Sequence, residues 1–396
     1  MKSLKFILAL VIFLPISASC KQYEDEASNH APLLWNMNRL DSIKKNRYKI
    51  AEIMTLLHEA DSLMLEKDIA VTQKSNPINQ DRHNYESLSS YFWPNPADTA
   101  APYIERDGLL NPETRTDDRR RLNKAAERIM KFALAYYISK DNKYADACIR
   151  QIKVWFLNKD TYMYPHFKYA QVIKNKNGNK GQPHGIIDAY VMNDILESIR
   201  LLDINKKLKK KDKRQLKKWF EDFAIWLTTD DLGIRESKQK NNHATAYDVL
   251  LLDISLFTSN QQRVNYIVSK FKSKRLSTLI MEDGSQPGEQ RRTRSYYYSY
   301  YNLIHIVDFC KILQSVGVNY YAEHKTYIDQ AFKYLLSFSE NREQYPYKEI
   351  GNWENIVKGL KMECGRLNQL AKNTDSSKSF KDYEVNIYND INSWIK

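Results

Sequence analysis

Residues 281–302 read MEDGSQPGEQRRTRSYYYSYYN, a stretch that passes from turn-forming residues into an aromatic run. Gly284, Pro287 and Gly288 interrupt regular structure, because glycine and proline are the strongest local breakers. Three arginines and five tyrosines follow, and the residues after them are apolar at helical spacing. The stretch therefore predicts a turn that leads into a helix over residues 295–316.

Helical spacing of apolar residues extends outward from this turn in both directions. Only 11 Gly and 11 Pro occur in 396 residues, mainly in loops, which leaves little room for a sheet. Pairs of helices joined by short turns, without a fixed repeat, predict an all-α fold, an (α/α) toroid or barrel of antiparallel helical hairpins. The predicted helices cover residues 33–67, 117–137, 143–157, 186–203, 208–229, 242–258, 262–280, 295–316, 320–338 and 353–373.

Two long segments have no clear periodicity. Residues 73–112 are rich in Pro, Asn, Asp and aromatic side chains, and residues 158–185 contain the flexible sequence NKNGNKGQ. Connections of this length inside a compact domain are usually functional. We therefore expect them to form active-site loops on a single helical domain.

The first residues are typical of an export signal. Two lysines precede an apolar run over residues 6–16, which is too short to span a membrane in the mature protein. The sequence SASC at residues 17–20 resembles a bacterial lipoprotein box, although a leucine is usual at its first position. Ordinary cleavage near Ala18 is the alternative, and membrane contact is expected only through a lipid on Cys20.

The chain is thus predicted to have three parts. Residues 1–20 form a signal peptide of lipoprotein type, residues 21–32 form a tether, and residues 33–396 form the toroid. This organisation predicts an exported protein, located in the periplasm or held as a lipoprotein at the outer membrane.

The charge balance predicts an anionic partner. Lys and Arg number 61 against 48 Asp and Glu, a formal charge of +13, which attracts anions. Nucleic acid, an acidic membrane face and an acidic polysaccharide all fit this balance. The 27 tyrosines and seven tryptophans favour sugar, so we expect an acidic polysaccharide and no nucleic acid.

Metal binding is not indicated by the histidines or cysteines. The residues three and four after His243 are Ala246 and Tyr247, so a zinc-binding helix is not expected. The cysteines after Cys20 are odd in number and have no paired spacing. No metal and no cofactor is predicted.

β-Elimination from a 4-linked uronic acid requires three groups, and the sequence offers residues for each. One neutralises the C5 carboxylate, one removes the C5 proton and one protonates the departing O4. His243 follows Asn242 at the start of an apolar helical run, near the positive end of the helix dipole. A purely structural histidine is the alternative there. On a helix that begins early, Arg294 and Arg291 share a face with Tyr298.

The first long loop carries groups suited to sugar subsites. Tyr91 and Trp93 supply aromatic faces, and Arg106 supplies a cation on the same loop system. An aromatic plug that seals one end of a helical bundle is an equally good interpretation.

Several motifs taken together resemble one family. They are Asn242-His243, DGS at residues 283–285, Glu289, Arg292 and a tyrosine shortly after. The supporting loops are YFWPNP at 91–96, PYIERDGLLNPE at 102–113, YAQ at 169–171 and GIID at 185–188. Over residues 80–310 the chain resembles the alginate lyase family of helical-toroid polysaccharide lyases, in a divergent, Bacteroidetes-type branch.

The resemblance implies a role for each matching residue. Asn242 and Arg292 neutralise the carboxylate, His243 assists them or acts as base, and Tyr298 shuttles the proton. The spacing from Arg292 is one residue shorter than usual, which leaves Tyr297 and Ser299 as alternatives to Tyr298. We choose Tyr298 because the following Asn-Leu pair then falls into register. The implied substrate-binding residues are Tyr91, Trp93, Arg106, Tyr169, Gln171, His184, Glu289 and Arg294.

The predicted function is therefore a lyase that cleaves alginate and leaves 4,5-unsaturated uronate ends. Glucuronan or another polyuronate is the alternative substrate, and a non-catalytic glycan-binding lipoprotein is the alternative class. An inverting glycoside hydrolase needs two carboxylates across the sugar, for which Asp107, Asp283 and Glu289 are candidates. Arginine-rich surroundings keep these groups ionised and argue against a general acid.

Overall fold

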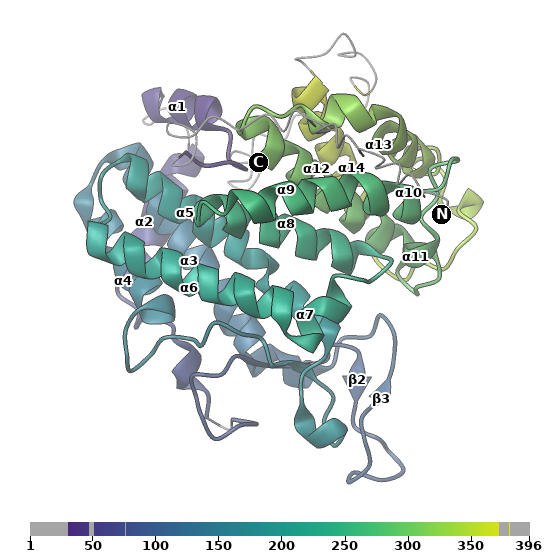
Figure 1. Cartoon of the computed structure of the whole chain (residues 1–396), viewed down its shortest axis with the longest axis horizontal. Helices are drawn as coiled ribbons and strands as arrows, with labels where there is room; N and C mark the ends of the chain where they lie inside the picture. The colour runs from purple at the N-terminus through teal and green to yellow at the C-terminus, as the bar shows by residue number, and fades with distance from the viewer. Residues whose placement is uncertain (1–30, 47–50, 76, 372–379, 381–396) are drawn as a thin grey trace, which may run out of the picture.

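The computed structural model describes residues 31–46, 51–75, 77–371 and 380, and almost all of its regular structure is helical (Figure 1). The α-helices are α1 Met37–Lys45, α2 Ala51–Met64, α3 Asp118–Ser139, α4 Asn142–Phe156, α5 Met192–Ile204, α6 Lys210–Thr229, α7 Asp231–Glu236, α8 Asn242–Phe257, α9 Gln261–Lys270, α10 Leu276–Leu279, α11 Pro287–Gln290, α12 Ser295–Ser315, α13 Tyr320–Leu336 and α14 Trp353–Ala371. The prediction of an all-α protein is confirmed.

Helices α8 and α12 form the centre of the helical array. Nearly every residue of α8 is buried, and α8 packs against α5, α6, α9 and α12 (Figure 1). A helix that is largely apolar on every side belongs in the interior, whereas α6 buries one face and leaves Lys210, Lys211 and Lys218 exposed. The N-terminal ends of α8 and α12 are therefore held by surrounding helices, and both ends carry predicted site residues.

Three predicted helices differ in detail from the observed ones. The predicted helix over residues 33–67 is two helices, α1 and α2. The predicted helix from residue 186 begins as the 3₁₀ segment η5 Pro183–Val191 and becomes α-helical only at α5. Between α9 and α10 the chain forms the π-helical segment η6 Phe271–Arg275. Spacing of apolar residues does not distinguish these variants, because all of them bury one face.

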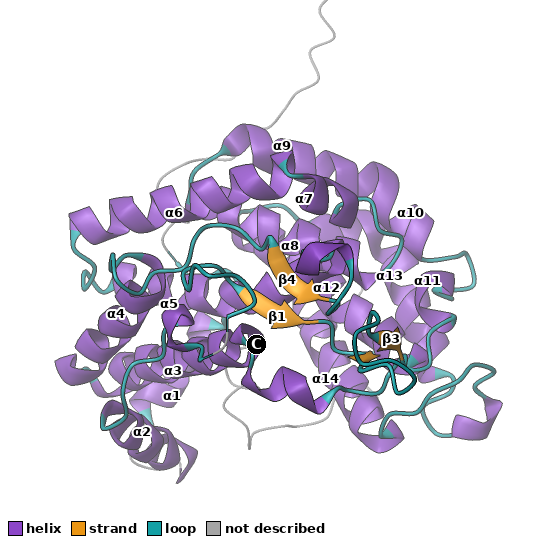
Figure 2. Cartoon of the chain, turned by 90° about the horizontal axis from the view of Figure 1, so that it is seen from below, coloured by secondary structure: helices purple, strands orange, loops and turns teal. Residues whose placement is uncertain are grey.

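The two long loops are tied together by short strands. β1 Glu86–Leu88 pairs in parallel with β4 Tyr169–Val172, and β2 Phe92–Trp93 pairs antiparallel with β3 Ile104–Glu105. Figure 2 shows β1 and β4 near the middle of the surrounding helices. Gly185 permits a close approach here, since a Cβ on it would lie 2.5 Å from the backbone oxygen of Ala170. These contacts fix loop residues against the ends of the central helices.

The remaining short helical segments lie in the loops: η2 Val71–Gln73, η3 Pro112–Thr116, η4 Asn177–Asn179 and η7 Arg342–Gln344. The predicted signal peptide, its Cys20 and most of the predicted tether lie outside the described residues. Within the described ranges, no helix has both the length and the apolar character that crossing a bilayer requires.

Candidate active site

Loop residues and the first turns of α3, α8 and α12 surround a cavity of about 560 Å³. Its walls come from segments far apart in the sequence, brought together by the pairing of β1 with β4 and of α8 with α12. The lining residues are Ser89, Ser90, Tyr91, Phe92, Glu105, Leu110, Arg119, Gln171, His184, Ile187, Gln239, Asn241, Asn242, His243, Arg291, Arg292, Arg294, Tyr297, Tyr298 and Tyr301.

Asn242 is the first residue of α8 and is held from behind by Glu289. The Nδ2 of Asn242 donates to Oε2 of Glu289 at 2.7 Å, and the backbone N–H of Asn242 donates to Oε1. Burial raises the pKa of Glu289 to about 7, against the opposing effect of these hydrogen bonds. The clamp fixes the amide plane of Asn242, which lines the cavity, while its Oδ1 has no hydrogen-bond partner among the described residues.

His243, the next residue, is oriented by another buried glutamate. Its Nδ1 lies 2.8 Å from Oε1 of Glu236 at the end of α7. Burial by itself lowers the pKa of His243, but the charge and hydrogen bond of Glu236 outweigh burial and raise it above its ordinary value. The ring of His184 lies edge-on to this imidazole, with 6.3 Å between centroids.

Arg292 also lines the cavity and is fixed by Asp107. Its Nη2 donates to Oδ1 of Asp107 at 2.6 Å, and the backbone N–H of Thr293 donates to the other oxygen at 2.9 Å. Burial favours the neutral acid, but these hydrogen bonds outweigh it and lower the pKa of Asp107 to about 2. The guanidinium carbon of Arg292 is 4.5 Å from the ring centre of Tyr298, a cation–π contact.

Tyr298 lies in the first turn of α12 and is 7% exposed. Its hydroxyl is hydrogen-bonded to that of Tyr91 at 2.5 Å. Burial and this contact raise the pKa of Tyr298 well above its usual value, while Arg292 and Arg294 act in the opposite direction. Tyr297 also lines the cavity, but its ring stacks on Tyr301 and lies under the guanidinium of Arg294.

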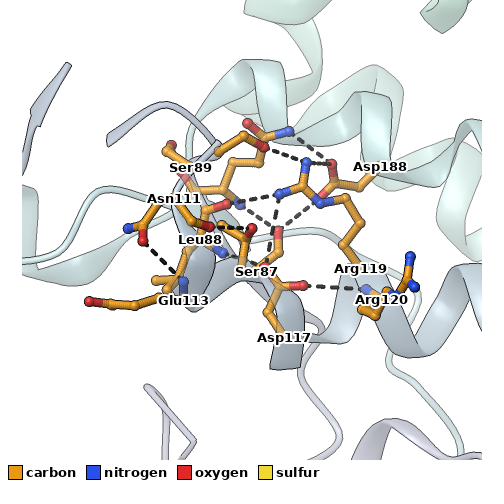
Figure 3. A network of polar contacts seen from close by, with 12 residues as sticks. Ser87, Leu88, Ser89, Asn111, Glu113, Asp117, Arg119, Arg120 and Asp188 are labelled. Atoms are coloured by element: carbon orange, nitrogen blue, oxygen red, sulfur yellow. Dashed lines mark hydrogen bonds and ion pairs between the residues drawn. The ribbon is translucent and has the colours of Figure 1, made fainter. Parts of the chain in front are cut away.

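A polar network around Arg119, which the sequence did not single out, also lies at the cavity. Figure 3 shows Arg119 between Asp188 and the strand that contains Ser87. Its Nη1 donates to Oγ of Ser90 at 2.6 Å and its Nη2 to the backbone oxygen of Leu88 at 3.2 Å. Gln171 donates to the same Asp188 carboxylate at 2.8 Å. The network adds the Arg119 cation to the three arginines of residues 291–294 that line the cavity.

A model of the alginate lyase family matches residues 69–345 of the chain. The chain belongs to the alginate lyase family. Among solved structures, it matches an alginate lyase from Bacteroides ovatus at 29% sequence identity and a TM-score of 0.85, over 92% of this chain and 98% of that one. The predicted family is confirmed, and membership makes the chain a polysaccharide lyase.

More distant alginate lyases share the fold. Alginate lyase A1-III from Sphingomonas species A1 matches at 15% identity and a TM-score of 0.51, over 81% of this chain and 89% of that one. A variant of A1-III in complex with a tetrasaccharide matches at 15% identity and a TM-score of 0.55, over 88% and 92%. No curated protein sequence matches. The predicted helical toroid is confirmed as the architecture of this alginate lyase family member.

Eight of the twelve site residues predicted for the lyase line the cavity: Tyr91, Gln171, His184, Asn242, His243, Arg292, Arg294 and Tyr298. Glu289 does not line it, because this side chain is 1% exposed and supports Asn242 from behind. The family resemblance placed Glu289 among the substrate-binding residues, but the sequence does not show on which side of Asn242 this carboxylate lies.

Three further predicted residues lie away from this cavity. Trp93 and Arg106 contact each other beside the β2–β3 hairpin, with 5.2 Å from the guanidinium carbon to the indole ring. Tyr169 lines a separate cavity of about 430 Å³ with Lys168 and Gln182. Their roles in substrate binding stay predictions, since the sequence does not determine which way a loop side chain faces.

The carboxylates considered for a glycoside hydrolase do not form a catalytic pair. Asp107 is bound to Arg292, Asp283 is exposed, and Glu289 is bound to Asn242. None of the three lines the cavity, where Glu105 is the one carboxylate among the described lining residues. Inverting hydrolysis requires two carboxyl groups across the sugar.

The described residues also hold no group of three or more His, Cys, Asp or Glu side chains placed to bind a metal ion.

Proposed function

We propose that this lyase cleaves alginate by β-elimination, with Tyr298 moving the proton. The observation that carries the proposal is the placement of Asn242, His243 and Arg292 around one cavity with the Tyr298 hydroxyl. The three donors suit an oxygen anion, and the phenol suits proton transfer. The alginate lyase from Bacteroides ovatus, similar over nearly its whole length, supports alginate as the substrate.

In the proposed reaction, the substrate carboxylate accepts hydrogen bonds from Asn242, His243 and Arg292. These donors stabilise the negative charge that develops on the carboxylate as the C5–H bond breaks. The phenolate form of Tyr298 accepts the C5 proton, the C4–O4 bond breaks, and a C4=C5 double bond forms. The resulting phenol then returns the proton to the departing O4, so that no net proton is gained or lost.

The surroundings of Tyr298 affect both steps of the proton transfer, acceptance from C5 and donation to O4. The cations of Arg292 and Arg294 favour the phenolate that accepts the proton, and the buried position favours the phenol that donates it. Tyr91 supplies a hydroxyl partner to Tyr298 in either form.

The proposal is tested by ultraviolet absorbance of the conjugated unsaturated uronate. The purified protein is expected to produce this absorbance with polymannuronate or polyguluronate, and the better polymer identifies the preferred linkage. Absorbance with glucuronan alone would change the substrate assignment. Binding of a polymer without any absorbance would favour the glycan-binding alternative.

From the sequence of residues 1–20 we also propose that the protein is exported and carries a lipid on Cys20. The expected mature protein begins at residue 20 and carries a lipid, which mass spectrometry of the protein from its native membrane fraction detects. A mature chain that begins near residue 19 without added mass would instead show ordinary cleavage.

A further inference from the structure

A buried carboxylate lies directly behind His243 and has no part in the reaction proposed above. Glu236 ends α7, and its side chain is 0% exposed. Oε1 is 2.8 Å from Nδ1 of His243, while Oε2 has no hydrogen-bond partner among the described residues. An ionised carboxylate in such a place is stable only when a cation or several donors compensate it. The imidazole of His243 is the group placed to do so.

The other charged and titratable groups around His243 do not replace it as the cation. His184, from η5, is neutral at ordinary pH because burial, together with the neighbouring His243 and Arg292, lowers its pKa to about 3. Glu289, from α11, is a second carboxylate that favours a charged imidazole. Arg292 opposes that charge, but its guanidinium is engaged by Asp107.

We infer that Glu236 is a positioning residue that accepts the Nδ1–H of a protonated His243 and leaves Nε2–H facing the cavity. This inference rests on the proposed function, in which His243 donates to the substrate carboxylate, and it adds the residue that keeps His243 charged and oriented for that role. An imidazolium has two N–H donors and no free lone pair, so it cannot accept the C5 proton. His243 then acts with Asn242 and Arg292 on the substrate carboxylate, and the base must be another group.

The protonation state is tested directly by NMR titration of the full chain labelled with ¹⁵N-histidine. The signals of His243 are assigned as those that disappear in His243→Gln. We expect both ring nitrogens to stay protonated above the ordinary pKa of histidine. In Glu236→Gln, which keeps an acceptor but removes the charge, the titration is expected about 1–3 pH units lower. A wild-type imidazole that loses its proton below the ordinary value would overturn the inference, even if Glu236→Gln failed to fold.

The kinetic test compares kcat/KM of Glu236→Gln with that of the wild type across pH. At pH values below the His243 pKa of both proteins, their kcat/KM values are expected to be equal, because the imidazole is charged in both. At pH values above both pKa values, kcat/KM of the variant is expected to be about 10- to 1,000-fold lower, since each pH unit of the shift lowers the charged fraction about tenfold. A loss of equal size at every pH would indicate a merely structural role and overturn the inference.

Asp231→Asn is the matched control, since it removes a carboxylate from the same helix. Asp231 is exposed and pairs with Arg235, so the His243 titration is not expected to change. The NMR result does not depend on lyase activity. A protein without activity that still shows the Glu236-dependent titration would contradict the proposed function and leave the placement of His243 intact.

Discussion

Replacing Tyr298 with phenylalanine is expected to lower kcat on the preferred polymer by about 10³-fold, since general acid and base catalysis each contribute on this scale. The variant removes one oxygen that, in the proposed reaction, both accepts the C5 proton and donates to O4. Steady-state measurement of unsaturated uronate formation gives the ratio. The ring itself remains, so its contact with Arg292 is retained.

Substrate binding is expected to persist in Tyr298→Phe, because the donors to the carboxylate are untouched. Binding of the polymer to the inactive variant, followed by calorimetry, separates a loss of chemistry from a loss of fold. Tyr300→Phe is the matched control, as Tyr300 lies in the same turn of α12 but does not line the cavity.

Tyr297→Phe resolves the alternative left by the sequence spacing. Tyr297 stacks on Tyr301 with an interplanar angle of 10°, and it has the cation of Arg294 over its ring. A large loss of kcat in Tyr297→Phe, with near-normal activity in Tyr298→Phe, would move the proton shuttle to Tyr297.

The helices could be predicted because their signals are local, and the central site residues because their motifs resemble those of the alginate lyase family. Periodicity of apolar residues located α8 and α12 to within one residue at their N-terminal ends. Asn242 and His243 follow a polar turn at the start of an apolar run, so their position at a helix start was visible in the sequence. Because nearly all of α8 is buried, its N-terminal end is the part of the helix that can face the cavity.

The partners of these residues could not be predicted, because they depend on tertiary contacts. Glu236 reaches His243 only through the turn between α7 and α8, and Asp107 reaches Arg292 across 185 residues of sequence. Arg119 is one of three consecutive arginines, and only the fold shows that this one lines the cavity. Trp93 and Arg106 illustrate the same limit, since a loop sequence contains no record of the direction its side chains face.

Removing the guanidinium of Arg292 is expected to have the second largest effect. Arg292→Ala should lower kcat/KM by about 10²- to 10³-fold, because a preorganised donor at the developing carboxylate charge is lost. Arg292→Lys keeps the charge but not the planar pair of donors, so we expect it to recover only part of the activity. Full activity in Arg292→Ala would contradict the assigned role of Arg292.

Asp107→Asn separates the position of Arg292 from its charge. The asparagine keeps one acceptor for the guanidinium and leaves its charge intact, so a smaller loss of about 10-fold is expected. Hydrogen bonds from Arg292 and Thr293 depress the pKa of Asp107 to about 2, so the stabilising effect of this pair is present above the ordinary pKa of aspartate and is lost only as pH falls toward 2. The ratio of wild-type to Asp107→Asn activity should therefore be flat between about pH 5 and 9, whereas the Glu236→Gln ratio changes as His243 titrates. A pH-dependent Asp107→Asn ratio in that range would show that Asp107 also sets the charge of a group in the cavity.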